Sequence, residues 1–194
     1  MPTFPKRQRP DPLYCVLDIQ EFPAQALAAY EPSLRARPFV VTCQDPESHK
    51  SAVWACSAGA LALGVGRGMP VAAAIKRFPQ VAAVARNKDL EIAAVEELRQ
   101  VFDRYSPQFY ISDRGSCLID LTATPASRTM SGRRIAESVR SDVLKAIVLD
   151  TLAIGVARSA VAARLLAKKA RPGGVCVCEA GDDMEALRAH ETHG

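Results

Sequence analysis

Residues 109–121, FYISDRGSCLIDL, lie near the middle of the chain and decide its fold. Two apolar runs, 109–112 and 117–121, flank the turn residues 114–116. Short apolar runs around a glycine-containing turn are typical of two strands joined as a hairpin. We therefore predict a β-hairpin here and work outward from it.

An amphipathic helix is predicted on each side of this hairpin. Before it, Asp89 is in position to cap a helix, and after it Ser131 is in position to cap another. Apolar residues at steps of three and four define one buried face on each helix. The two faces are Leu90, Ala94, Leu98, Val101, Phe102 and Tyr105, and then Ile135, Val139, Val143 and Ile147.

Further strands complete the sheet. Apolar runs at 14–19, 81–85, 151–156 and 175–178 predict strands, and Ser159 is placed to cap a helix that continues to about Lys169. The order strand, helix, hairpin, helix, strand favours a ferredoxin-like α+β fold, a mixed sheet backed by two long helices. The Ala-rich segment 22–80 reads as a small, mainly helical insertion with a strand at 38–42 and a further apolar run at 51–56. Residues 1–11 read as a flexible lead.

Composition excludes several classes of protein. The chain has 194 residues, of which 48% are hydrophobic and 24% charged, which excludes a disordered chain. No stretch approaches the roughly 18 apolar residues of a membrane span, and no secretory signal is present. The six cysteines lie mostly in apolar runs, and Cys176 and Cys178 lack metal-site spacing. We expect a cytoplasmic protein without a membrane partner.

The basic residues gather in one part of the chain. Residues 128–171 hold ten Lys and Arg against three acidic residues, whereas the net charge of the whole chain is +4. This asymmetry points to a polyanionic partner, nucleic acid above all. On charge alone, a merely solvated basic surface is the more common explanation, so both stay open.

Several motifs at matching spacing resemble the Y-family, translesion DNA polymerases. They are LDIQEF at 17–22, RARPFVV at 35–41, ALGVGRGMP at 62–70, LIDLT at 118–122, IGVA at 154–157, ARL at 163–165 and RPGG at 171–174. The resemblance implies a palm at 12–21 and 81–178, fingers at 22–80, and the start of a thumb or tail at 179–194. It also implies that the thumb and the little finger are absent.

The same resemblance implies that the catalytic carboxylates are lost. Two-metal phosphoryl transfer needs several carboxylate oxygens. Asp18 matches the family's first Asp, but the Asp-Glu pair of the hairpin falls on Gly115 and Ser116, and a further acidic position is Gln20. The palm topology of the family implies that Asp18 lies beside Gly115 and Ser116, in adjacent central strands. Sliding the register to use Asp113 places Arg114 where the Glu stands. We therefore expect no catalytic residue, and Asp18 is either a structural acid or a weak ligand of a single cation.

The nucleotide contacts implied by the resemblance are missing too. The triphosphate-binding positions fall on Ala58, Leu61 and Ala160, and the aromatic steric gate on Pro23. No nucleotide-binding site and no cofactor is expected, and Mg²⁺ only if activity remains.

DNA contacts are expected elsewhere, at Arg164, Lys168, Lys169 and Arg171. Val161, Ala162, Leu165 and Leu166 should pack that helix on the sheet. Binding would be weak and without sequence preference.

The leading hypothesis is a non-catalytic adaptor or accessory subunit in DNA repair and translesion synthesis. The resemblance is to ImuB-type subunits of a mutasome in the SOS response, which implies partners such as a polymerase or the sliding clamp. One alternative is a DNA-directed nucleotidyltransferase with an atypical metal site. Another is a protein-interaction module without a nucleic-acid role.

Overall fold

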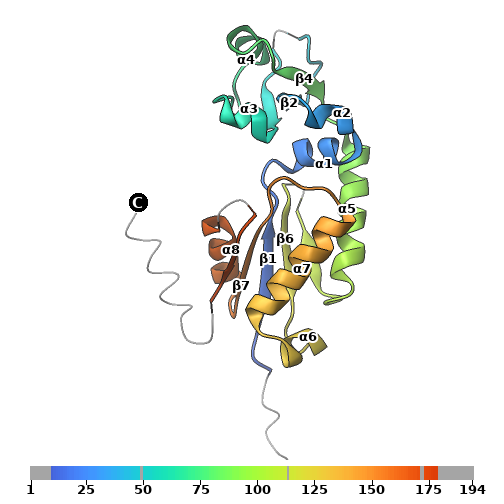
Figure 1. The fold of residues 1–194 in the computed structure, drawn as a ribbon, viewed down its shortest axis with the longest axis vertical. Helices are drawn as coiled ribbons and strands as arrows, with labels where there is room; N and C mark the ends of the chain where they lie inside the picture. Colours follow the sequence, from blue (N-terminus) through green and yellow to red (C-terminus); the bar gives the residue numbers. More distant parts are fainter. Residues whose placement is uncertain (1–9, 49, 113, 171–172, 179–194) are drawn as a thin grey trace, which may run out of the picture.

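The computed structural model describes residues 10–48, 50–112, 114–170 and 173–178. Within them the chain forms a five-stranded sheet of order β5-β6-β1-β7-β8 and a three-stranded sheet of order β3-β2-β4. Figure 1 shows two lobes stacked along the long axis, the larger built on the five-stranded sheet and the smaller on the three-stranded one.

The larger sheet is mixed and centred on β1 (Tyr14–Asp18). β1 pairs antiparallel with β6 (Ser116–Asp120) on one side and with β7 (Ala153–Ala157) on the other. The outer strands are β5 (Phe109–Ile111), antiparallel to β6, and β8 (Val175–Val177), parallel to β7. The predicted hairpin and the mixed α+β class are confirmed.

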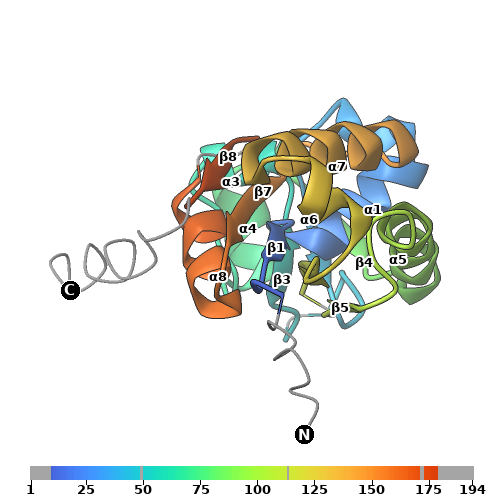
Figure 2. The ribbon, with the colours of Figure 1, turned by 90° about the horizontal axis from the view of Figure 1, so that it is seen from below.

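Helices cover both faces of this sheet. α5 (Lys88–Phe102) and α7 (Gly132–Ala146) pack on one face, where Leu17, Leu98 and Val139 share a core. α8 (Ala160–Lys169) packs on the other face over Val16. Figure 2 shows α5 and α8 on opposite sides of β1. The two long backing helices are those that the apolar stripes predict.

The helix caps follow the sequence with one correction. Ser131 and Ser159 cap α7 and α8, as predicted, by accepting bonds from the backbone N–H of Arg134 and Ala162. The cap of α5, however, is Asn87, whose Oδ1 accepts from the N–H of Asp89 and Leu90. Asp89 is wrong as the cap because an Asn two residues earlier already occupies that position.

The smaller lobe holds strands as well as helices. β2 (Phe39–Thr42) pairs antiparallel with β3 (Val53–Cys56) and parallel with β4 (Ala82–Ala85). The strand expected at 81–85 therefore exists, but its placement in the larger sheet is wrong. A strand's partner is a long-range choice that its own residues do not encode. The strand predicted at 38–42 is confirmed as β2, and the apolar run at 51–56 holds β3, so the mainly helical segment 22–80 contributes two strands to this sheet.

Four helices accompany that segment. They are α1 (Phe22–Tyr30), α2 (Pro32–Arg35), α3 (Ala58–Ala62) and α4 (Val71–Arg77); one more short helix, α6 (Pro125–Thr129), precedes α7. α1 joins the lobes, because Phe22 and Ala26 pack into the core of the larger lobe while Ala24 and Leu27 pack into the smaller one. A helix buried on both sides fits its low polarity. None of the helices in the described ranges is long and apolar enough to span a membrane.

Candidate functional site

Asp18 ends the central strand directly opposite the hairpin turn. It is the register partner of Ser116, and the next residue, Ile19, donates its N–H to the carbonyl of Gly115 at 3.0 Å. The hairpin is held by the N–H of Ser116, which donates to Oγ of Ser112 at 3.0 Å. The prediction that Asp18 lies beside Gly115 and Ser116 is therefore confirmed.

A cavity of about 230 Å³ opens beside Asp18. Among the described residues, its charged lining consists of Asp18 and three cations: Arg114 from the hairpin, and Arg164 and Lys168 from α8. Uncharged lining residues are Val16, Tyr110, Ser112 and Ser116. The described residues contain no group of three or more His, Cys, Asp or Glu side chains able to hold a metal ion. The cavity has more cations than acids, so it suits an anion better than a divalent cation.

The carboxyl of Asp18 is half-buried, and its surroundings shift its pKa. Burial raises the pKa above its usual 3.8 because the charged form loses water, while the nearby charge of Lys168 pulls it down. Burial is the larger effect, and the net direction is upward. Lys168 thus supplies a tethered positive charge close to this carboxylate.

The surroundings of Gly115 leave no room for a side chain. Its φ is +82°, and a Cβ there would lie 2.5 Å from the carbonyl oxygen of Ile19 and 2.6 Å from Cβ of Phe22. Real Cβ atoms essentially never approach other atoms so closely. The turn from β1 into α1 lies directly against the hairpin, and a carboxylate at this position would require the two segments to separate.

α8 lies close on β7 because Gly155 has no side chain. A Cβ on Gly155 would collide with the backbone of Ala163 and Ala167. The buried face of α8 consists of Ala162, Ala163 and Ala167, and Leu166 packs partly against it. The expectation that Val161 packs on the sheet is wrong, since Val161 is 61% exposed. Alanines form the buried face because only small side chains fit at this separation between α8 and β7.

The remaining predicted residues are spread over the molecule. Ala58 and Leu61 lie on α3 in the smaller lobe and line a different cavity of about 200 Å³. Ala160 begins α8, just after the end of β7 that pairs with Tyr14, so it lies at the strand end away from Asp18. Lys169 ends α8, and Arg171 lies outside the described residues.

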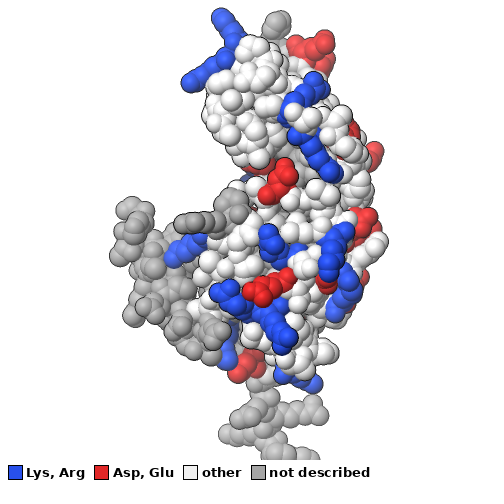
Figure 3. All heavy atoms as spheres, in the orientation of Figure 1, with Lys and Arg blue, Asp and Glu red and all other residues white. Residues whose placement is uncertain are grey.

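Acids offset part of the basic charge on α7. Arg133 lies 3.7 Å from Glu137, and Lys145 lies 3.8 Å from Asp142. On the face in Figure 3, blue and red side chains intermingle over the lower lobe. The solvated-surface explanation therefore fits α7, whereas Arg164 and Lys168 of α8 border a cavity.

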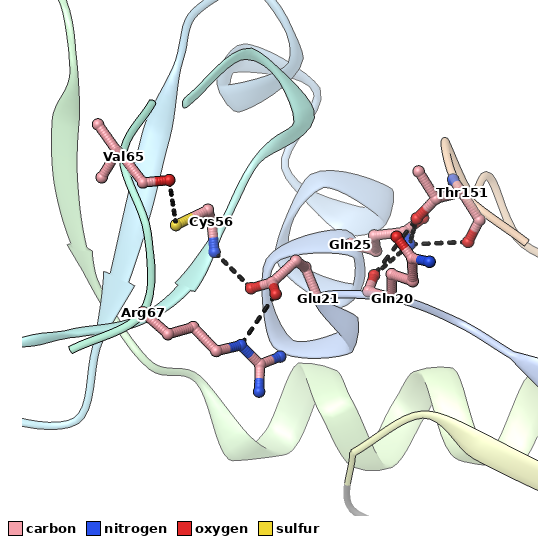
Figure 4. Close-up of polar contacts among 7 residues, drawn as sticks. All are labelled: Gln20, Glu21, Gln25, Cys56, Val65, Arg67 and Thr151. Atoms are coloured by element: carbon pink, nitrogen blue, oxygen red, sulfur yellow. Dashed lines mark hydrogen bonds and ion pairs between the residues drawn. The ribbon is translucent and has the colours of Figure 1, made fainter. Parts of the chain in front are cut away.

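Polar contacts join the two lobes just beyond Asp18 (Figure 4). Glu21 accepts a hydrogen bond from the N–H of Cys56 at 2.8 Å and pairs with Nε of Arg67 at 2.9 Å. It does so from a left-handed backbone conformation, φ +53°, which is costly for a non-glycine residue. Gln25 donates to the carbonyl of Gln20 at 2.6 Å and to that of Thr151 at 2.9 Å. Sequence reasoning missed Glu21, because the residues next to it do not indicate a partner, Arg67, 46 residues away.

The model of the impB/mucB/samB family matches residues 17–168. DNA polymerase IV of Bacillus velezensis is 28% identical over 181 residues, which cover 92% of this chain and 43% of that protein. DNA polymerase IV of Saccharolobus solfataricus is 24% identical over 182 residues, covering 92% and 51%.

Solved structures show the same fold. DinB from Sulfolobus solfataricus superposes with a TM-score of 0.72 at 21% identity, covering 93% of this chain and 57% of that one. A post-insertion binary complex of Dbh DNA polymerase gives a TM-score of 0.74 at 21% identity and the same coverage. The chain spans about half the length of the curated relatives it matches.

Proposed function

Since the chain belongs to the impB/mucB/samB family of Y-family DNA polymerases, we propose that it binds DNA in repair or translesion synthesis without catalysing nucleotide transfer. The larger lobe is the palm of that fold and the smaller lobe the fingers. The proposal assigns the palm a binding role in place of a chemical one.

The observation that carries this proposal is the state of the hairpin opposite Asp18. Two Mg²⁺ ions need several carboxylate oxygens to hold them and to balance their charge. Asp18 is the one acid among the described residues that line its cavity, and Arg114, Arg164 and Lys168 oppose further cations there. Neighbouring atoms already occupy the space that a Cβ at Gly115 would need. The residues around Asp18 therefore do not fit a pair of metal ions.

The cations that disfavour Mg²⁺ favour phosphate. Arg164 and Lys168 are four residues apart on one face of α8, and both border the cavity with Arg114. Such side chains neutralise backbone phosphates and release counterions, which gives binding without sequence preference. With about three phosphates contacted, the affinity should lie near 10⁻⁴–10⁻⁶ M and fall steeply with salt.

We further propose that the protein acts as an adaptor, in which the palm and fingers hold DNA while a partner supplies the chemistry. The support is the family resemblance to ImuB-type subunits together with the cation-rich cavity. A replication polymerase or the sliding clamp is the class of partner that this role requires.

Two measurements on the purified chain test the DNA-binding and non-catalytic parts of the proposal. No template-directed extension of primed DNA is expected with Mg²⁺ or Mn²⁺. Fluorescence anisotropy should show salt-dependent binding that weakens in the double variant Lys168→Glu, Lys169→Glu. The matched control, Arg133→Glu with Lys145→Glu, reverses as many charges on exposed positions of α7 and should bind more tightly than the α8 variant.

Each part has its own contrary result. Extension that Asp18→Ala abolishes would show an active, atypical metal site. Equal affinities for the α7 and α8 variants would remove α8 from the DNA interface. Binding insensitive to salt would favour a protein-interaction module instead.

A further inference from the structure

We propose that Trp54 is a stacking platform for an unpaired base of single-stranded DNA, in a cavity between the fingers and the hairpin turn. This deepens the proposed function and rests on it, because the ligand is DNA. It goes further by placing a base-binding position at a residue that the phosphate contacts do not use.

Trp54 is an exposed aromatic residue in a strand that is otherwise buried. Its neighbours in β3, Val53 and Ala55, are 3% and 0% exposed, whereas Trp54 is 40% exposed. It is the chain's one tryptophan. Single exposed apolar side chains are common on protein surfaces, so it is the surroundings of Trp54 that indicate a ligand.

The ring is held in place from one side. The guanidinium carbon of Arg86 lies 5.4 Å from the ring centroid, in cation–π contact. Arg86 is itself fixed by two hydrogen bonds of 2.7 Å to the carboxylate of Glu91. The ring is therefore pre-organised on the Arg86 side, and less conformational freedom is lost when a ligand stacks on it.

The cavity that Trp54 borders is cationic. It measures about 380 Å³ and is lined by Lys50, Arg67 and Arg114, and the described residues of its lining include no Asp or Glu. Arg67 shares its charge with Glu21, which lies outside that lining. Cations around an aromatic ring form the combination that binds single-stranded nucleic acid, with phosphates on the cations and bases on the ring.

Arg114 connects this cavity to the one beside Asp18, because it lines both. The cationic surface thus continues from Lys168 and Arg164 on α8, past Arg114, to Trp54. A DNA strand whose phosphates follow these residues would bring a base to the Trp54 ring. The base must be unpaired, since the faces of bases inside a duplex are already covered by their neighbours.

The single tryptophan makes a direct test possible in the wild-type chain. We would titrate it with oligothymidylate, with an abasic strand of the same length, and with a blunt duplex. Oligothymidylate should quench Trp54 fluorescence saturably, and the abasic strand and the duplex should not. Anisotropy of labelled strands, measured in parallel, reports binding independently of the tryptophan.

Variants then separate the ring from the fold. Trp54→Ala should bind oligothymidylate about tenfold more weakly, and Trp54→Phe, which keeps a stacking ring, less than threefold. Ile92→Ala removes another exposed apolar side chain, on α5, and should change nothing. Circular dichroism checks that each variant is folded.

The outcomes distinguish the two proposals. Binding by anisotropy without quenching, or equal quenching by the abasic strand, overturns the stacking role and leaves the phosphate contacts of α8 intact. An absence of binding to all three DNAs overturns the proposed function itself.

Discussion

Gly115, in the hairpin turn opposite Asp18, has no room for a side chain. The β1–α1 turn occupies the volume that a Cβ would need. The neighbouring Asp18 keeps its place opposite the hairpin but faces cations. At the scale of the residue, a carboxylate at position 115 does not fit against the β1–α1 turn.

Asp18 gives a pH-dependent prediction. Its pKa is raised in the folded state, so the folded protein holds this proton more tightly than the unfolded chain does. The charged carboxylate therefore costs stability, and that cost appears as the pH rises from about 3.8 through the raised pKa. Asp18→Asn should raise the thermal midpoint at pH 7.

The pH profile of Asp18→Asn is the decisive measurement. Calorimetry of the wild-type protein and the variant between pH 3 and 8 should show their difference in thermal midpoint shrinking toward zero near pH 3.8, where Asp18 itself becomes neutral. A loss of stability at pH 7 would mean that the ionised carboxylate is stabilising, as in a tight pair with Lys168.

At the scale of the element, α8 decides the character of the cavity. Its inner face is made of alanines, and it lies against Gly155 of β7 at backbone contact. This close packing sets where the opposite edge of the helix, with Arg164 and Lys168, meets the end of β1. The position of the cations is thus a consequence of a glycine in the neighbouring strand.

Gly155→Ala should destabilise the fold and move α8. The new Cβ meets backbone atoms of Ala163 and Ala167, which cannot turn aside as a side chain could. Overpacking of this kind costs about 1–3 kcal/mol. Urea unfolding measures this loss of stability.

Gly66→Ala is the control, because a Cβ there has no neighbour within 4 Å, and its change in stability should stay within about 1 kcal/mol. Equal effects of the two substitutions would refute the close contact.

At the scale of the whole molecule, two polar side chains fasten the fingers to the palm. Glu21 reaches Cys56 and Arg67 in the smaller lobe. From the next helix, Gln25 accepts the N–H groups of Asp150 and Thr151 in the larger lobe, at 2.8 and 3.1 Å. The strained backbone at Glu21 is kept because these bonds over-determine it. The relative position of the two cavities depends on this junction.

Glu21→Ala should loosen that junction. The N–H of Cys56 would lose its acceptor, at a cost of about 1–3 kcal/mol, and Arg67 would lose its ion pair. The carboxylate also helps burial to raise the pKa of the Cys56 thiol to about 11, so that pKa should fall. Hydrogen–deuterium exchange of 53–56 should become faster.

The control for the Glu21→Ala experiment is Glu137→Ala, which breaks an exposed ion pair on α7. Glu21→Gln, which keeps an acceptor for Cys56 but loses the charge, should fall between the two. Exchange at 53–56 that is no faster than in the Glu137 variant would mean that Glu21 does not hold the lobes together.

The sequence alone determined the features that local chemistry encodes. Apolar steps of three and four on α5 and α7, the serine caps and the glycine turn of the hairpin each follow from neighbouring residues, as does the strand at Tyr14–Asp18. The motif spacing also placed Asp18 beside Gly115 and Ser116.

Only the tertiary structure decided what depends on distant partners. The sheet that β4 joins, the cations that α8 brings to Asp18 and the reach of Glu21 to Arg67 all join segments far apart in the chain. The cation–π contact between Arg86 and Trp54 likewise joins segments far apart in the chain. A residue's own neighbours fix its preference for helix or strand, but pairing and approach between segments arise from packing the whole core.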